Sequence, residues 1–81
     1  MKIYLLRHGE TDWYKEGRLQ GHTDIPLNQN GIMQINLAGD YLVLINEIID
    51  VVISSPLMRA VKSAEIISMK VGYQPECVTN T

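Results

Sequence analysis

Short apolar runs alternate along this chain with longer segments of helical periodicity, and this alternation limits the possible folds more than any other feature. The runs at residues 2–7 and 51–53 contain β-branched and aliphatic side chains, as buried strands do. A polar break follows each of them, and residues 76–79 could form a third short strand. The order strand, helix, strand, helix, strand predicts an α/β fold with a parallel sheet.

The two segments between these runs have the periodicity of amphipathic helices. A first helix, capped by Asn28 or Asn30, is predicted to start near Gly31, with apolar positions spaced three and four apart as far as Ile49. So broad an apolar face predicts that this helix lies against the sheet. The second helix is predicted to start at Pro56, with its apolar side chains on one face and charged ones on the other.

Length, charge and cysteine content exclude several classes of protein. A chain of 81 residues leaves room for a single domain, expected to span residues 1–81. The net charge is -2, and the absence of any basic run argues against a nucleic-acid partner. The single cysteine, Cys77, cannot form an intrachain disulfide, and no apolar stretch is long enough for a signal or a membrane span. We therefore expect a cytoplasmic protein without a membrane partner.

One histidine and two arginines are predicted to lie at the same edge of the sheet. Arg7 and His8 end the first apolar run, whereas Arg59 falls in the first turn of the second helix. Ligands of open parallel sheets gather at the carboxyl ends of the strands, so these side chains should converge there. Two guanidinium groups can hold a phosphate dianion, and the free amides of a helix N-terminus add to the attraction.

His8 is the candidate nucleophile of this group. A neutral imidazole can attack phosphorus, and a covalent phosphohistidine divides one difficult phosphoryl transfer into two easier steps. The arginines would supply the positive charge that magnesium supplies in most kinases. No residues have the spacing of metal ligands, so we predict neither a metal nor another cofactor.

Four segments resemble motifs of the histidine phosphatase superfamily, in its branch with phosphoglycerate mutase. They are residues 7–11 (RHGET), 16–21 (EGRLQG), 26–31 (PLNQNG) and 54–60 (SSPLMRA), in the same order as in the family. Four ordered motifs are far more specific than one. The resemblance implies the N-terminal part of a three-layer α/β/α phosphoglycerate mutase-like fold with a parallel sheet.

The resemblance also implies roles for individual residues. By this resemblance His8 is phosphorylated during turnover, and Arg7 and Arg59 bind the phosphoryl group. Gln20 and Gly21 lie where the family contacts its substrate. The implied activity is metal-independent transfer of phosphate from a small phosphorylated metabolite to water, as in a phosphatase, or to a second hydroxyl, as in a mutase.

Two departures from the family pattern limit this expectation. Tyr14 stands where many members have asparagine. The family's acid/base carboxylate and second pocket histidine follow beyond the point where this chain stops, so we expect a truncated domain with very slow turnover. The alternative is a non-catalytic fragment that binds phosphate and self-associates. A homo-oligomer is expected in either case, because two helices can hardly cover both faces of a parallel sheet.

Other polar residues near the motifs have competing interpretations. His22 lies in a polar loop and is expected to be exposed to solvent. Glu10 could donate a proton, but support of the turn after His8 is the preferred interpretation. Ser54 and Ser55 are expected to cap the second helix. Trp13 and the tyrosine after it either cover the mouth of an active site or pack the loop, and the sequence does not separate these alternatives.

Overall fold

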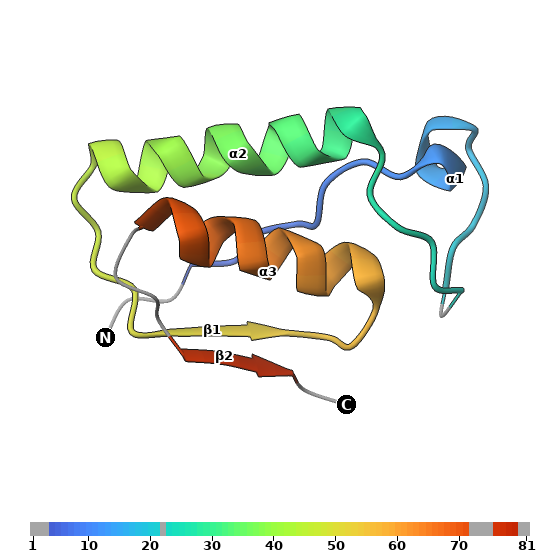
Figure 1. The fold of residues 1–81 in the computed structure, drawn as a ribbon. Coiled ribbons are helices and arrows are strands. Elements are labelled where there is room, and N and C mark those ends of the chain that lie inside the picture. Colours follow the sequence, from blue (N-terminus) through green and yellow to red (C-terminus); the bar gives the residue numbers. More distant parts are fainter. Residues whose placement is uncertain (1–3, 22, 72–75, 80–81) are drawn as a thin grey trace.

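Two long helices lie over a small parallel sheet in the structure, a computed structural model that describes residues 4–21, 23–71 and 76–79. The elements are α1 (Asp12–Lys15), α2 (Gln29–Leu44), β1 (Val51–Ser54), α3 (Met58–Val71) and β2 (Glu76–Thr79). β1 and β2 pair in parallel, from Val51 opposite Glu76 to Ser54 opposite Thr79. No helix in these ranges is long and apolar enough to cross a bilayer. Figure 1 shows α3 between α2 and the strands.

The ends of α2 are set by two asparagines. The side chain of Asn28 accepts a hydrogen bond of 2.8 Å from the amide of Gly31, so Asn28 caps the first turn as predicted. Asn46 has φ of 55°, a left-handed conformation that ends the helix. The expected continuation of this helix to Ile49 is therefore wrong, because the apolar spacing continues beyond a residue at which the backbone turns away.

The core lies between α2 and α3. Ile35 of α2, only 2% exposed, packs with Ile66 and Ile67 of α3. Three partly buried side chains surround this cluster, namely Leu27, Ala38 and Leu42. The two helices approach closely at Gly39, where an added Cβ would lie 2.8 Å from the Cβ of Lys70.

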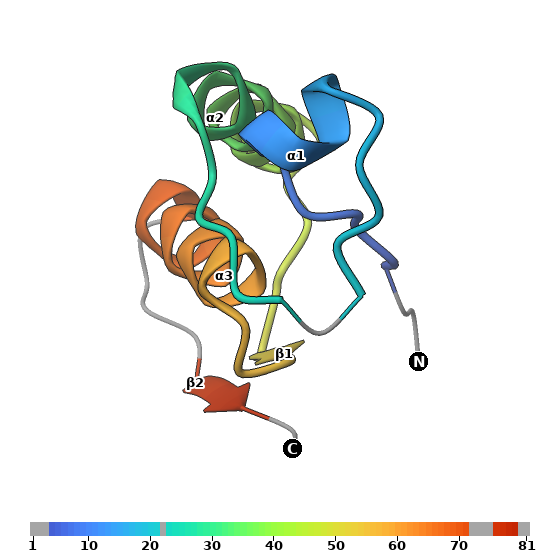
Figure 2. The same ribbon diagram turned by 90° about the vertical axis from the view of Figure 1, so that its right-hand side faces the viewer.

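α2 covers α3 and makes no contact with either described strand, which corrects the expectation that this helix lies on the sheet. α3 contacts both strands and occupies that position instead. Figure 2 shows the two helices nearly end-on, with only α3 next to the strands. The apolar residues that broaden the face of α2 consequently remain in solvent, and Leu37 is 62% exposed.

The first predicted strand does not form over residues 4–7, and the rest of the run lies outside the described residues. β1 and β2 pair with each other, and residues 4–7 pass behind α3 without joining either strand (Figures 1 and 2). A β-strand forms when a neighbouring strand pairs with its backbone N–H and C=O groups, and residues 4–7 have no such neighbour among the described strands. The strands predicted at residues 51–53 and 76–79 are confirmed, as is the α/β class.

Replacing Ile35 by alanine should lower the free energy of unfolding by about 2 to 4 kcal/mol, because the cavity would form inside a core of few residues. Leu37→Ala removes a side chain of equal size from the exposed face of the same helix and should change stability by less than about 0.5 kcal/mol. Urea unfolding of both variants measures the difference. Equal losses would show that the core does not lie between α2 and α3.

Candidate functional site

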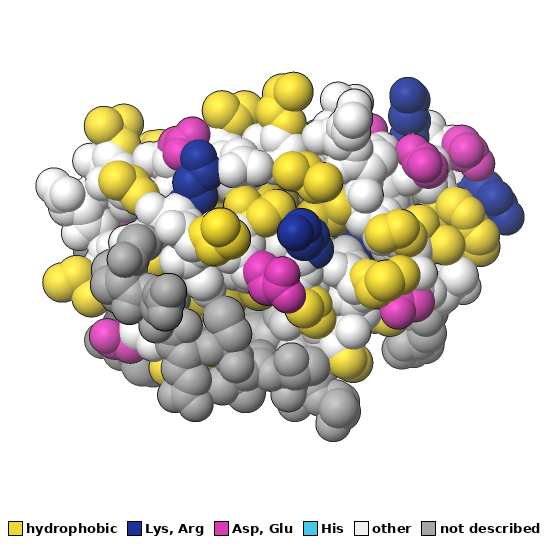
Figure 3. Space-filling view, viewed as in Figure 1, with side chains coloured by type: hydrophobic (Ala, Val, Ile, Leu, Met, Phe, Trp, Pro, Cys, Tyr) yellow, Lys and Arg dark blue, Asp and Glu magenta, His cyan; other side chains and the backbone are white. Residues whose placement is uncertain are grey.

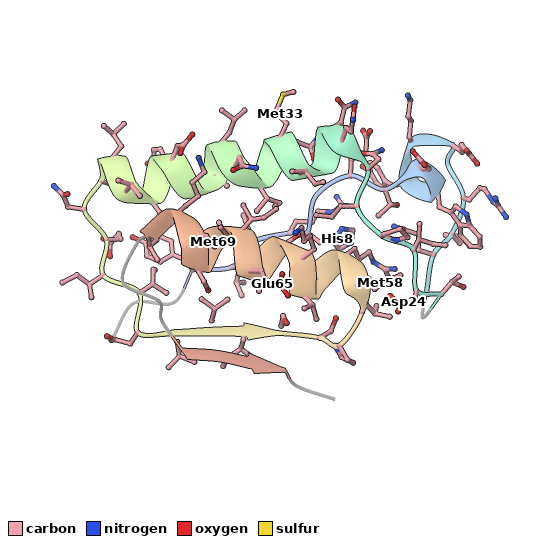
Figure 4. All side chains as sticks on the ribbon, in the orientation of Figure 1. His8, Asp24, Met33, Met58, Glu65 and Met69 are labelled. Atoms are coloured by element: carbon pink, nitrogen blue, oxygen red, sulfur yellow. The ribbon has the colours of Figure 1, made fainter. Side chains whose placement is uncertain are left out.

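The turn that carries His8 is fixed against the beginning of α3. The buried amide of Gly9 donates a hydrogen bond of 3.3 Å to Oγ of Ser63. Ser63 in turn donates to the backbone carbonyl of Arg59 over 2.7 Å. These two bonds bring the turn after the first apolar run beside the first turns of α3, and Figure 4 shows His8 next to that helix.

The half-buried imidazole of His8 has a defined hydrogen-bond partner. Its Nδ1 lies 2.8 Å from the carbonyl oxygen of Gly9. Because a carbonyl oxygen can only accept, this bond requires the proton on Nδ1 and leaves the lone pair of a neutral ring on Nε2. The geometry therefore favours the tautomer in which Nε2 is the unprotonated nitrogen.

The backbone of residues 9–10 crosses the first turn of α2 in direct contact. A Cβ added to Gly31 would overlap the carbonyl oxygen of Glu10, and one added to Gly9 would overlap that of Gly31. The carbonyl of Glu10 also accepts the amide of Asn28 over 3.0 Å. Only glycine fits at both points of this crossing, which joins the His8 turn to α2.

The carboxylate of Glu10 accepts hydrogen bonds from residues at the start of α2. Its Oε1 accepts hydrogen bonds from the side-chain amides of Asn28 at 3.0 Å and Asn30 at 3.4 Å. The amide of Glu10 donates to Oε1 of Gln34 over 2.9 Å. These bonds agree with the interpretation that Glu10 supports the turn after His8.

Arg59 is a buried cation held by backbone carbonyls. Its side chain projects from the first turn of α3, and the residue is only 6% exposed. Nη1 donates to the carbonyl of Thr23 over 2.7 Å, and Nη2 donates to that of Gly21 over 2.8 Å. Nε is buried without a partner, and no carboxylate in the described part of the chain pairs with the guanidinium. A buried charge in this state favours an anion beside it.

Arg7 and Arg18 each lie over an aromatic ring of α1. The guanidinium carbon of Arg7 is 4.8 Å from the ring centre of Tyr14, and that of Arg18 is 3.9 Å from the ring of Trp13. Cation–π contacts of this kind hold an arginine in place without neutralising its charge. Tyr14 thus restrains Arg7, whereas the half-buried Trp13 packs the loop.

The side chain of Gln20 is held by a hydrogen bond from Thr11. The hydroxyl of Thr11, which is completely buried, donates to Oε1 of Gln20. The same hydroxyl accepts the amide of Tyr14 over 3.2 Å and so caps α1. Gln20 and Gly21 are therefore fixed from different directions, the first by Thr11 and the second by Arg59.

The sequence reasoning missed two residues that organise the site. Ser63 is a polar residue within the apolar spacing of the second helix, and that position was a signal that its hydroxyl has a buried partner. Asp24 gave no such signal. Its Oδ1 accepts the amide of Met58 over 2.6 Å, so Asp24 binds the first amide of α3. The expected capping by Ser54 and Ser55 is corrected accordingly, and Ser54 is the last residue of β1.

Some of the predicted site residues contact one another in the structure, and others do not. Arg59 and Gly21 are hydrogen-bonded, but among the described residues no hydrogen bond or ion pair links Arg7 or His8 to Arg59. Two surface hollows, one between α1 and the start of α2 and the other beside Met58, include none of these three residues. His22 lies outside the described ranges, within which no group of three side chains could hold a metal ion.

Comparison with known proteins identifies a family. A sequence profile of the histidine phosphatase superfamily (branch 1) matches residues 3–80. An uncharacterized phosphatase PhoE of Bacillus subtilis is 46% identical over 66 residues, which are 82% of this chain and 33% of that protein. A 2,3-bisphosphoglycerate-dependent phosphoglycerate mutase of Elusimicrobium minutum is 45% identical over 62 residues, 76% of this chain and 25% of the mutase.

Solved structures agree with this match. A phosphoserine phosphatase of Entamoeba histolytica, crystallised with 3-phosphoglyceric acid, superimposes with a TM-score of 0.73 at 37% identity. The superposition covers 90% of this chain and 34% of the phosphatase. The chain thus has the α/β fold of phosphoglycerate mutase-like phosphatases and spans about a third of the length of the relatives it matches.

Gly31→Ala should destabilise the chain by about 1 to 3 kcal/mol, because the new methyl group would overlap the backbone of Glu10. The sign is informative, since glycine to alanine in an unobstructed helix raises stability by up to about 1 kcal/mol. Gly17→Asn is the control, because that position has φ of 76°, which asparagine tolerates, and nothing within 4 Å. A stabilised Gly31→Ala variant in thermal unfolding would show that the backbones do not cross in contact.

Proposed function

The chain belongs to the histidine phosphatase superfamily, and from this membership we propose that it carries out phosphoryl transfer through a phosphohistidine at His8. The donor is a small phosphorylated metabolite, and the acceptor is water or a second hydroxyl. Two relatives support this substrate class, one a phosphoglycerate mutase and the other a phosphoserine phosphatase crystallised with 3-phosphoglyceric acid. Because the chain covers about a third of their length, the activity concerns the protein to which these residues contribute.

The observation that carries the proposal is the hydrogen bond between Nδ1 of His8 and the carbonyl of Gly9. With the proton on Nδ1, the lone pair of Nε2 forms a bond to phosphorus while the bond from phosphorus to the ester oxygen breaks. The leaving oxygen takes up a proton from water. In the second step water or a hydroxyl attacks phosphorus and gives up its proton to solvent, the nitrogen–phosphorus bond breaks, and the imidazole regains its lone pair.

Arg59 and Arg7 are the proposed partners of the phosphoryl oxygens. Arg59 is buried, oriented by two carbonyls and without a described acidic partner, so an anion beside it would compensate its charge. Arg7 is restrained by Tyr14, and no acidic side chain in the described part of the chain pairs with it. Two fixed cations would stabilise the charge of the transferring group with little reorganisation. Gln20 and Gly21 are the proposed substrate contacts.

A second candidate function is phosphate binding without turnover. The observation that favours it is the state of Glu10, the carboxylate nearest to His8 in sequence, which is held by two asparagine amides rather than free to donate a proton. General acid catalysis contributes roughly 10² to 10⁴ in rate. In this alternative the pair of arginines binds phosphate, but the ester bond does not break.

Incubation with a reactive phosphoryl donor such as phosphoramidate should label His8 with an acid-labile, base-stable phosphate. His8→Ala should abolish the label, and His22→Ala should retain it. These are the two histidines of the chain, so the pair is a matched control. Intact-mass spectrometry after acid and base treatment measures the outcome. A label that survives His8→Ala would refute the nucleophile, and an unlabelled wild-type chain that still binds phosphate would favour the second function.

Arg59→Ala should weaken the binding of inorganic phosphate by about 10- to 100-fold, the effect of removing a charged hydrogen-bonding partner. Arg18→Ala removes the same charge from the exposed surface and should have less than about a threefold effect. Calorimetric titration at two salt concentrations checks both variants, and circular dichroism checks that α3 is retained. Equal phosphate affinity of the Arg59→Ala variant and the wild type would count against this site.

A further inference from the structure

α3 has an outward face that the fold and the proposed site leave unused. Its members are Met58, Lys62, Glu65 and Met69, spaced four, three and four residues apart, so they form one stripe along the helix. All four are exposed, Met58 by 47% and Met69 by 80%. Figure 4 shows Met58, Glu65 and Met69 along the side of α3 that faces the viewer.

The stripe has the spacing of the a and d positions of an antiparallel helix pair. It is also symmetric about its centre. Lys62 and Glu65 lie on either side of the midpoint, Met58 is four residues before Lys62, and Met69 is four residues after Glu65. A two-fold axis through the midpoint therefore places each methionine opposite the other methionine of a second chain, and each charge opposite its counterion.

We propose that this stripe of α3 is the interface of a symmetric dimer, in which the helices of two copies of this chain pack antiparallel. Lys62 of each copy then faces Glu65 of the other, and the two ion pairs lie at the centre of the contact. Neither residue has an ion-pair partner among the described residues of its own chain. The interface is isologous, so the contact closes with two copies and does not extend into a fibre.

The surface beside Met58 provides a place for the methionine of the second copy. An apolar hollow lies there, lined by Pro26, Leu27, Ile32, Pro56, Met58 and Val61, with Lys62 and Glu65 at its side. Figure 3 shows hydrophobic side chains around basic and acidic ones on this same face. Methionine is unbranched and fills irregular gaps well, so Met69 of the partner suits this hollow.

The size of the contact sets its strength. From Met58 to Met69 the helix rises about 17 Å, which is short for a stable interface. We therefore expect a weak dimer with a dissociation constant in the micromolar range or above. The specificity comes from the order of the charges rather than from the buried area. Only the antiparallel two-fold arrangement places Lys62 of each copy opposite Glu65 of the other.

Exchange of the two charges tests the interface in the 81-residue chain. Lys62→Glu and Glu65→Lys should each turn both central pairs from attractive to repulsive and weaken dimerisation roughly tenfold or more. An equimolar mixture of the two single variants should dimerise again, because each copy then offers only one sign of charge to the other. The double variant K62E/E65K should dimerise like the wild type. Sedimentation equilibrium over a range of concentrations measures all four.

Two variants control for the change of net charge. Lys15→Glu and Glu16→Lys alter exposed residues at α1 by the same charges and should leave dimerisation unchanged. Circular dichroism checks that each variant keeps the helix content of the wild type. A wild-type chain that stays monomeric throughout would overturn the proposal, as would dimerisation that is insensitive to the single changes or not restored in the mixture.

Discussion

The site depends on one steric constraint, the contact between the backbone of residues 9–10 and the first turn of α2. At this crossing the two segments are so close that neither Gly9 nor Gly31 could carry a side chain. The contact fixes the turn after His8 from one side, and the hydrogen bond from Gly9 to Ser63 fixes it from the other. A residue from the beginning of the chain is thereby held between two helices that also contact each other through their small core and through the ion pair of Lys70 with Asp40.

The second organising element is a charge without a described counterion. Arg59 is buried, yet its described partners are neutral carbonyls, which orient the guanidinium but leave its charge uncompensated. Structural arginines more often pair with carboxylates. An anion beside Arg59 would compensate this charge, whereas the exposed guanidinium of Arg18 stacks on Trp13 and lies near Glu16.

The sequence predicted the type of most elements, but not how they are packed together. Helix periodicity predicted an apolar face on α2, and Ile35 and Ala38 of that face belong to or border the core. It could not say that their partner is α3 rather than the sheet, because an apolar stripe specifies burial and not the surface that buries it. The end of α2 at Asn46 was missed for a similar reason, since apolar spacing continues past a residue whose backbone turns left-handed. Motif order indicated the candidate site residues, whereas Asp24 and Ser63 act through contacts distant in sequence, which no local pattern encodes.

The carbonyls of Gly21 and Thr23 share one guanidinium, so an anion bound to Arg59 would be coupled to the positions of these two residues. An anion that binds Arg59 meets a side chain already oriented by the loop, and an ordered loop lowers the entropy lost on binding. Thermodynamic reciprocity requires the converse: an anion bound at Arg59 would hold Gly21 and Thr23 in place by the same free energy. The segment that contains the proposed substrate contacts Gln20 and Gly21 would then be most ordered when a phosphoryl group is present. The affinity for phosphate and the order of Gly21 and Thr23 would then be linked through one side chain of α3, that of Arg59.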